Sequence, residues 1–505
     1  IQKVGLGNLA VNAPITSGFN FLIDEGLADI LSPGPHMVGY TRTYSGSILL
    51  TNDTIFALGV HPVQSLYLGD KAGAYSLSNR VSRSSTLTVP EKGYNVASGK
   101  LNIGQNGHAV LDIADNAYVE GPLIMGNASG SGGAVYQTGN SAFLNTAGAA
   151  NDGAIGTSGY GHYWLASGSF TNKGYTHVGR NSGSYGVFRQ TGGTFYRAGG
   201  ATPANGTVST NYGGHFTITR NGNGAILLYG GQFLYNGGTW SVNSDGNYDT
   251  AAAYSVLTIG GESYARVDNG SVDIGRLTNA LSTSLINFES NGVLHARRIY
   301  SNAYPSKKYI NFNGGTFRVH RGDGANIFLF NYTGLNQPTR TTLYGDGATF
   351  DVDAGLIRTV DIPLSAPAGR GLVSCDFDTP LTGYYAPPFA VVNGHGGYAG
   401  FVDTVFDRDT GAVSGIRVIS PGNDHPAADV TVTLYGGGQT NATLAIPTTP
   451  TQTSGGLTKR GGGTLILTSG TNSYTGPTRV LEGALAVGHP AAIPSASAIE
   501  VGRAM

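Results

Sequence analysis

The sequence is poor in cysteine, in charge and in long apolar runs. Its 505 residues include one cysteine, Cys375, which excludes an internal disulfide framework and any zinc site built from several cysteines. Charged residues make up 12% and the formal net charge is −1, so there is no electrostatic footprint for nucleic acid or an anionic membrane. No apolar run approaches the roughly 18 residues of a membrane-spanning helix, and we expect no direct membrane insertion.

Glycine and aromatic residues are abundant instead. The chain contains 80 Gly, 28 Tyr and 19 Phe, which disfavour helices and suit turns and half-buried strands. An apolar share of 40% still allows a large core. This composition predicts an all-β chain with many short strands.

Two marks recur along the middle of the chain. One is an apolar residue followed by Gly, as in Ile103-Gly104, and the other is a Gly pair followed two places later by an aromatic residue, as in Gly192-Gly193-Thr194-Phe195. Neighbouring marks of one kind are often 17 to 23 residues apart. Glycine permits positive φ where the chain turns, and repeats of this length must stack on their neighbours to bury an apolar face. We therefore predict a β-solenoid with coils of about 20 residues; sandwiches or a propeller are the alternative, although no blade signature is visible.

One short pattern occurs near both ends. Lys3-Val4-Gly5-Leu6-Gly7 is followed by Glu25-Gly26, and Lys459-Arg460-Gly461-Gly462-Gly463 is followed by Glu482-Gly483. Both copies read K-x-G-x-G and then E-G. Since the chain starts and stops within such copies, we expect it to be a segment of something longer.

The second copy carries a resemblance to a known family. The stretch 455–488, with Asn472-Ser473-Tyr474-Thr475-Gly476 in its middle, resembles the autotransporter-associated β-strand repeat of large bacterial surface and secreted proteins. The N-terminal copy lacks the N-x-Y-x-G element, and Ser17-Gly18-Phe19 stands near its place. The resemblance implies a right-handed parallel β-helix that is exported to the cell surface or outside the cell. It implies no catalytic residues.

Breaks in the pattern predict four regions. Residues 1–98 would start the solenoid with irregular loops, 99–379 would form its main part, 380–450 would be an inserted Gly-rich β module with a linker, and 451–505 would hold the C-terminal repeat. The module is expected because strands with alternating residues are separated there by Gly and Pro turns.

Parallel β-helices also carry polysaccharide hydrolases and lyases, which need paired carboxylates or acidic clusters. Gly394-His395-Gly396 is similar to a pectinase element but has no Asp-Asp dipeptide to accompany it. Asp351 and Asp353 would share one strand face, and we favour a solvated face over a metal pair. Asp407 and Asp409 fit a charged turn before Gly411 better than a site.

Other candidates are weaker still. Arg321-Gly322-Asp323 spells an integrin-type tripeptide that arises easily by chance, and His162 and His177 have no metal-ligand spacing, which favours surface or stacked residues. A group of aromatic residues favours inward stacked ladders, with an outward row for glycans as the alternative: Tyr160, Tyr163, Trp164, Tyr175 and Tyr185.

The sequence thus predicts a structural or adhesive extracellular surface protein, a segment of a solenoid stalk or filament, and not an enzyme. A glycan-binding adhesin and a polysaccharide lyase or hydrolase stay open as alternatives. We expect no catalytic, cofactor-binding or metal-binding residue and no cofactor. The expected partners are other copies of the chain, by end-to-end or lateral assembly, and surface glycans.

Overall fold

The computed structural model describes residues 2–15, 20–32, 35–38, 41–50, 54–58, 66–89, 99–146, 152–197, 216–236, 240–242, 252–268, 270–275, 279–301, 305–319, 327–331, 339–393 and 396–502. It forms two compact units. Unit 1 comprises Ile1–Ala225, Gly383–Pro387 and Gly436–Gln439, and unit 2 comprises Ile226–Thr382, Pro388–Tyr435 and Thr440–Met505. No helix occurs among the described residues, and the prediction of an all-β chain is confirmed.

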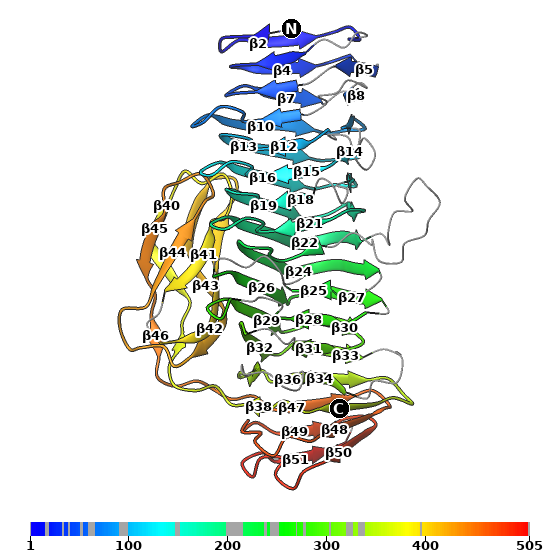
Figure 1. Cartoon of the computed structure of the whole chain (residues 1–505), viewed down its shortest axis with the longest axis vertical. Coiled ribbons are helices and arrows are strands. Elements are labelled where there is room, and N and C mark those ends of the chain that lie inside the picture. Colours follow the sequence, from blue (N-terminus) through cyan, green and yellow to red (C-terminus); the bar gives the residue numbers. More distant parts are fainter. Residues whose placement is uncertain are drawn as a thin grey trace. The chain divides into compact units, whose positions relative to one another are not determined.

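Unit 1 is built from three ladders of short parallel strands that follow one another along the chain (Figure 1). The β12 ladder contains β1 (Gln2–Lys3), β3 (Phe21–Ile23), β6 (Thr41–Thr43), β9 (Leu66–Leu68), β12 (Leu101–Ile103), β15 (Leu123–Met125), β18 (Gly153–Ile155), β21 (Thr176–Val178) and β23 (Phe216–Thr217). The β13 ladder contains β2 (Asn8–Val11), β4 (Leu27–Ile30), β7 (Ser47–Leu50), β10 (Tyr75–Val81), β13 (His108–Ile113), β16 (Gly132–Gln137), β19 (Tyr160–Leu165) and the start of β22 (Tyr185–Arg197). The β14 ladder contains β5 (Pro35–Val38), β8 (Ile55–Leu58), β11 (Thr86–Thr88), β14 (Tyr118–Gly121), β17 (Ala142–Asn145), β20 (Ser169–Asn172) and the end of β22.

The apolar-Gly marks explain the turns of the β12 ladder. Four of them begin with a fully buried residue that is also the last residue of its strand: Ile103, Met125, Ile155 and Val178. Gly104 then has a φ of +75°, and a Cβ there would overlap the carbonyl oxygen of Gly132 in the next coil. Glycine is therefore required by both the backbone conformation and the close approach of the neighbouring coil.

The Gly-aromatic marks place rings inside the coils. Phe143, Phe170 and Phe195 pair in register along the β14 ladder, and their rings stack at centroid distances of 5.1 and 5.4 Å. All three are fully buried, so these rings form an inward ladder through unit 1.

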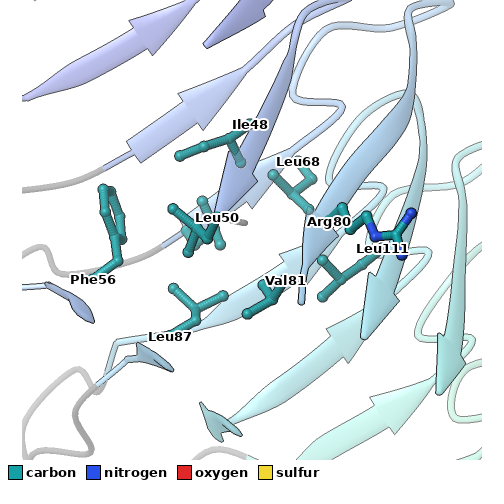
Figure 2. A pocket seen from close by; sticks show the side chains of 9 residues that line it. Ile48, Leu50, Phe56, Leu68, Arg80, Val81, Leu87 and Leu111 are labelled. Carbon is teal, nitrogen blue, oxygen red and sulfur yellow. The ribbon is translucent and has the colours of Figure 1, made fainter. Parts of the chain in front are cut away.

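Packing among the described residues of unit 1 leaves a small apolar gap. Figure 2 shows its lining, which includes Ile48, Leu50, Phe56 and Leu87, and its volume is about 10 Å³. A space of this size holds at most one water, and its apolar walls offer that water no hydrogen bond. The gap is a packing defect of the core rather than a ligand site.

Unit 2 repeats the same construction. The β28 ladder contains β25 (Trp240–Ser241), β28 (Val272–Ile274), β31 (Ile299–Ser301), β34 (Ile327–Asn331), β37 (Ile357–Val360), β48 (Thr464–Leu467) and β50 (Ala484–Val487). The β29 ladder contains β26 (Tyr254–Ile259), β29 (Thr283–Glu289), β32 (Lys307–Asn313), β35 (Thr339–Leu343) and β38 (Leu364–Ser365). The β30 ladder contains the end of β24 (Asn223–Asn236), β27 (Tyr264–Asp268), β30 (Val293–Ala296), β33 (Thr316–Val319), β36 (Ala348–Val352), β47 (Leu457–Arg460), β49 (Thr478–Val480) and β51 (Ile499–Val501).

Between β38 and β47 the strand pairing becomes antiparallel. One small sheet contains β40 (Cys375–Leu381), β43 (Ala412–Asn423) and β42 (Tyr398–Asp407), a second contains β41 (Phe389–Asn393), β44 (Thr431–Tyr435) and β45 (Ala442–Ala445), and β39 (Gly371–Leu372) pairs with β46 (Thr448–Thr449). This antiparallel module has an apolar core of its own, which includes Ile416, Val432 and Leu434. The fold is therefore a parallel β-solenoid with an inserted antiparallel module, as the sequence predicts, and the parallel ladders exclude the propeller.

Within unit 2, the module packs on the outward face of the β29 ladder. The hydroxyl of Tyr254 donates to the carbonyl of Gly400 at 2.6 Å. Arg417 pairs with Glu289 at 3.4 Å and lies over the ring of Tyr229, with 4.6 Å between its guanidinium carbon and the ring centroid. Hydrogen bonding, charge and aromatic contact thus all hold this part of the module to the coils.

Candidate functional site

The C-terminal copy of the short pattern forms a locked corner between β47 and β48. Lys459 points inward from β47, in register with the buried Phe350, and is fully buried. Its ammonium donates to the carbonyls of Arg460 at 2.6 Å, Gly461 at 2.7 Å and Glu482 at 3.2 Å. Burial lowers the pKa of Lys459, against the attraction of Asp351 and Glu482. One cation therefore ties its own turn to the turn of the following coil.

The N-terminal copy forms the same corner in unit 1. The ammonium of Lys3 donates to the carbonyls of Val4 at 3.1 Å, of Gly5, and of Glu25 at 3.2 Å. The three acceptors occupy the same places in the pattern as those of Lys459. The K-x-G and E-G elements thus encode a carbonyl cage for lysine.

The glycine after the acidic residue is needed for the corners to stack. Gly483 has a φ of +68°, and a Cβ there would overlap the carbonyl oxygens of Gly461 and Gly463. Gly26 has a φ of +74°, and its Cβ would overlap the carbonyl of Gly7. Neither position tolerates a side chain, because the preceding turn already fills the space.

The N-x-Y-x-G element joins consecutive coils on another side of unit 2. The side-chain oxygen of Asn472 accepts the amide of Leu364 at 2.8 Å, and its amide nitrogen donates to the carbonyl of Ala492 at 2.6 Å. Tyr474 is fully buried with its hydroxyl 2.8 Å from that of Thr478. This element therefore links the coils before and after it. Ser17-Gly18-Phe19, its counterpart near the N-terminus, lies outside the described residues.

Asp351 and Asp353 lie on either side of an arginine. The guanidinium of Arg318 is 3.8 Å from a carboxylate oxygen of Asp351 and 3.1 Å from one of Asp353. Burial raises the pKa of Asp351, although Arg318 acts in the opposite direction. Both carboxylates are thus engaged in an ion-pair cluster on the strand face. Among the described residues, no group of three or more His, Cys, Asp or Glu side chains could hold a metal ion.

Asp407 and Asp409 lie in the turn between β42 and β43. The carboxylate of Asp407 accepts the amide of Asp409 at 2.9 Å and the hydroxyl of Thr410 at 2.8 Å, which lowers its pKa. Gly411 follows with a φ of +65°. Both carboxylate oxygens of Asp407 therefore accept hydrogen bonds within the turn, so its role is to cap that turn.

The aromatic group divides between the two faces of the β13 ladder. Tyr163 is fully buried, stacks on Phe188 at 5.8 Å and donates its hydroxyl to Gln137 at 2.6 Å. The alternate residues Tyr160 and Trp164 point outward, as does Tyr185, which pairs with Tyr160 in the ladder. Tyr175, which is half-buried, lies between β20 and β21. Inward packing therefore accounts for only part of the group.

His162 is not a surface residue. It is fully buried on β19, with its ring centroid 6.3 Å from Tyr136 and 6.1 Å from Trp164. Its outward direction would expose it on a bare solenoid, and the side chains of Trp164 on its own strand and Tyr136 on the neighbouring strand provide part of its cover.

His177 belongs to a charged cluster that the sequence reasoning missed. Its Nε2 is 3.7 Å from a carboxylate oxygen of Asp152, which also pairs with Arg180 at 3.1 Å and Arg220 at 3.3 Å. Its Nδ1 lies 2.8 Å from the hydroxyl of Thr217. Burial raises the pKa of Asp152, but His177 and the two arginines outweigh it and hold that pKa below its usual value. His177 and Thr217 lie on successive strands of one ladder and pair in register. No local sequence pattern indicates that Asp152 and Arg220 would join them.

Two sequence candidates cannot be placed. His395 of the Gly394-His395-Gly396 element and the whole Arg321-Gly322-Asp323 tripeptide lie outside the described residues. Within the described ranges, no helix is long and apolar enough to cross a membrane.

The parallel coils and their locked corners define a stacking repeat rather than a reaction centre. Residues 457–487, which contain the Lys459 corner and the N-x-Y-x-G element, match the model of the passenger-associated-transport-repeat. No curated protein and no solved structure matches the chain. The recognition of an autotransporter-associated repeat is thus confirmed, and a repeat of this kind indicates an autotransporter passenger domain that is secreted to the cell surface or the extracellular space.

Proposed function

We propose that this chain is a segment of a long β-solenoid stalk or filament in an exported bacterial surface protein, with a structural or adhesive role. The observation that carries the proposal is the Lys459 corner inside the matched repeat, because its cation binds carbonyls of two consecutive coils. Such a corner stabilises coil-on-coil stacking and has no reactive geometry. Each added coil extends the solenoid by about 4.8 Å, so repetition produces length.

A glycan-binding adhesin is the second candidate. Trp164 and Tyr185 are half-buried on the outward face of unit 1, and Tyr196 is 37% exposed. Aromatic faces of this kind stack on sugar rings through their C–H bonds. A polysaccharide lyase or hydrolase has less support, because the acidic pair Asp351 and Asp353 is engaged by Arg318. We propose surface glycans and further copies of the chain as partners.

The proposal is tested on cells that make the native protein. Antibodies against the described part of unit 1 should label intact cells, and a protease added outside should remove that label. Electron microscopy of the released protein should show thin rods. Antibody labelling only after cell lysis, or globular particles in the micrographs, would contradict the proposal that the chain is part of a stalk. Glycan arrays then separate the adhesin from a purely structural role, and release of soluble sugars from a bound polysaccharide would favour the enzyme.

A further inference from the structure

Two loops of the inserted module belong to unit 1 and pack on the outward face of its β13 ladder. These are Gly383–Pro387 and Gly436–Gln439, and we call them the covering loops. Tyrosine hydroxyls of the ladder donate to their backbone carbonyls: Tyr136 to Tyr385 at 2.7 Å, Tyr160 to Pro387, and Tyr75 to Gly438 at 3.3 Å. The attachment thus includes polar contacts that water could replace.

His108 lies beneath the first covering loop. Its ring stacks on Tyr75 at 4.6 Å, and its Nδ1 is 3.2 Å from the hydroxyl of Tyr385. In the tautomer that carries its proton on Nε2, the neutral ring accepts a hydrogen bond from that hydroxyl. Burial disfavours the charged ring and lowers the pKa of His108.

His162 is a second buried histidine on the outward face of the same ladder, and its ring contacts Tyr136, whose hydroxyl donates to the covering loop. It lies between Ala134 and Val187 in the ladder, is 0% exposed, and neither ring nitrogen has a hydrogen-bond partner among the described residues. Burial, and secondarily the charge of Arg189, hold the pKa of His162 well below 6.5.

The charged groups around His162 cannot stabilise its cation. Arg189 on β22 lies with its guanidinium carbon 5.4 Å from the ring centroid of Trp164, the ring that also contacts His162. Tyr385 of the covering loop is a neutral phenol, because burial raises its pKa far above the usual value. Asp112, on β13, is two strands away and pairs in register with Tyr136. Protonation of His162 therefore requires water to enter.

We propose that neutral His108 and His162 keep the covering loops attached to unit 1, and that acidification releases the loops by protonating both rings. Release gives each imidazole access to water and uncovers the hydroxyls of Tyr136 and Tyr160. The loops would thus act as an acid-sensitive cover on one lateral face of the solenoid, whatever that face binds.

The direction of the effect follows from linkage. Both histidines have a lower pKa when covered than the ordinary 6.5 that they approach when released. Attachment is therefore fully stable above about pH 6.5 and weakens as the pH falls below it, until the pKa of the covered state is reached. Each pH unit in that window weakens attachment up to about tenfold per histidine, and up to about a hundredfold for the two together.

The test is amide hydrogen exchange on the full chain between pH 8 and pH 5, corrected for the intrinsic pH dependence of exchange. We expect the covering loops to lose protection reversibly below pH 6.5 while β13, β16 and β19 stay protected. Trp164 reports the same event by fluorescence, because protonated histidine quenches a neighbouring indole and the chain has only two Trp. A Trp240→Phe variant isolates that signal, and exchange on the unmodified protein serves if this variant does not fold.

Matched variants decide the cause. The double variant His108→Gln, His162→Phe should keep its loops protected to pH 5, whereas His489→Gln, which removes an exposed imidazole, should behave like the parent chain. Unchanged protection of the loops down to pH 5 in the parent overturns the proposal. So does an equal acid response in the double variant, or a simultaneous loss of protection in the three strands, which would indicate unfolding of unit 1.

Discussion

The Lys3 corner of unit 1 and the Lys459 corner of unit 2 have the same design but different surroundings. Each ammonium binds carbonyls at the same three positions of the pattern. Lys459 is fully buried because β47 pairs with β36 on one side and β49 on the other, whereas Lys3 is half-buried and, among the described residues, β1 pairs only with β3. The pattern therefore encodes the corner, and the neighbouring coils decide how strongly it is desolvated.

The acidic residue shows the same contrast. A carboxylate oxygen of Glu482 accepts the amide of Gly461 at 3.1 Å. Among the described residues, the Glu25 carboxylate makes no matching bond to the amide of Gly5. The hydrogen bonds to backbone carbonyls are thus the same in both copies, whereas the hydrogen bond of the acidic side chain differs between them.

The largest effect should come from the glycine that both corners share. Gly483→Val and Gly26→Val should each destabilise their local coils by about 3–5 kcal/mol, since a side chain at positive φ would also overlap carbonyls of the preceding turn. Denaturant unfolding combined with hydrogen exchange measures the loss. The control is Gly355→Val, with a φ of +79° and open space around its Cβ, which should cost only about 1–2 kcal/mol. Equal losses for Gly483 and Gly355 would contradict the stacking argument.

Replacing the corner lysines should affect the stability of the two corners unequally. Lys459→Met should cost about 1–3 kcal/mol, because buried carbonyls lose their donor, while Lys3→Met should cost less than about 1 kcal/mol in its wetter corner. Arg460→Met, which changes the exposed neighbour on the same strand, should stay within about 0.5 kcal/mol. Chemical denaturation at pH 7 measures all three. Similar losses at Lys3 and Lys459 would show that burial is irrelevant to the corner.

A third lysine separates burial from the corner geometry. Burial, against the attraction of Asp273, lowers the pKa of Lys308 to about 8, from 10.5. Lys308 therefore loses its proton at a lower pH in folded unit 2 than in the unfolded chain. The free energy of unfolding should consequently rise between pH 8 and 10.5, by about 1–2 kcal/mol. Unfolding followed by the fluorescence of the buried Trp240 measures it. Lys308→Met should remove the rise, whereas the exposed Lys307→Met should keep it; a rise that survives in Lys308→Met would assign it to another group.

The smallest effect concerns the acidic residue. Glu482→Gln should weaken the bond to the Gly461 amide and cost about 0.5–1 kcal/mol, because the charge of the acceptor strengthens that bond. Glu25→Gln should be neutral within measurement error. Differential scanning calorimetry or local hydrogen exchange at the two corners compares them, and a larger loss at Glu25 would reverse our assignment.

Much of the solenoid could be read from residue patterns, because they report local requirements. The apolar-Gly marks at Ile103 and Val178 are strand ends, since a buried side chain must be followed at once by a turn with positive φ. The aromatic marks at Phe170 and Phe195 are inward rings, since two residues along a strand return to one face. The division of the chain into four domains stays a prediction.

The covered face could not be predicted in the same way. Tyr136 and Tyr160 meet Tyr385 and Pro387 across more than two hundred residues, and no periodicity connects them. The Asp152 cluster has the same origin, because Arg220 reaches its carboxylate from 68 residues away. Outward side chains need not be apolar, so they leave no periodic pattern in the sequence. Their partners depend on which distant loops pack against that face.

The sequence by itself determined the repeating coil, the corner lysine with its carbonyls, and the autotransporter-type repeat at 457–487. These follow from backbone geometry and from burial, which act over a few residues and leave a periodic record. Tertiary structure alone decided that Lys459 is fully desolvated, that His162 is buried, and that tyrosine hydroxyls hold the covering loops. The physical reason is that desolvation depends on everything packed around a group, and most of that comes from distant parts of the chain.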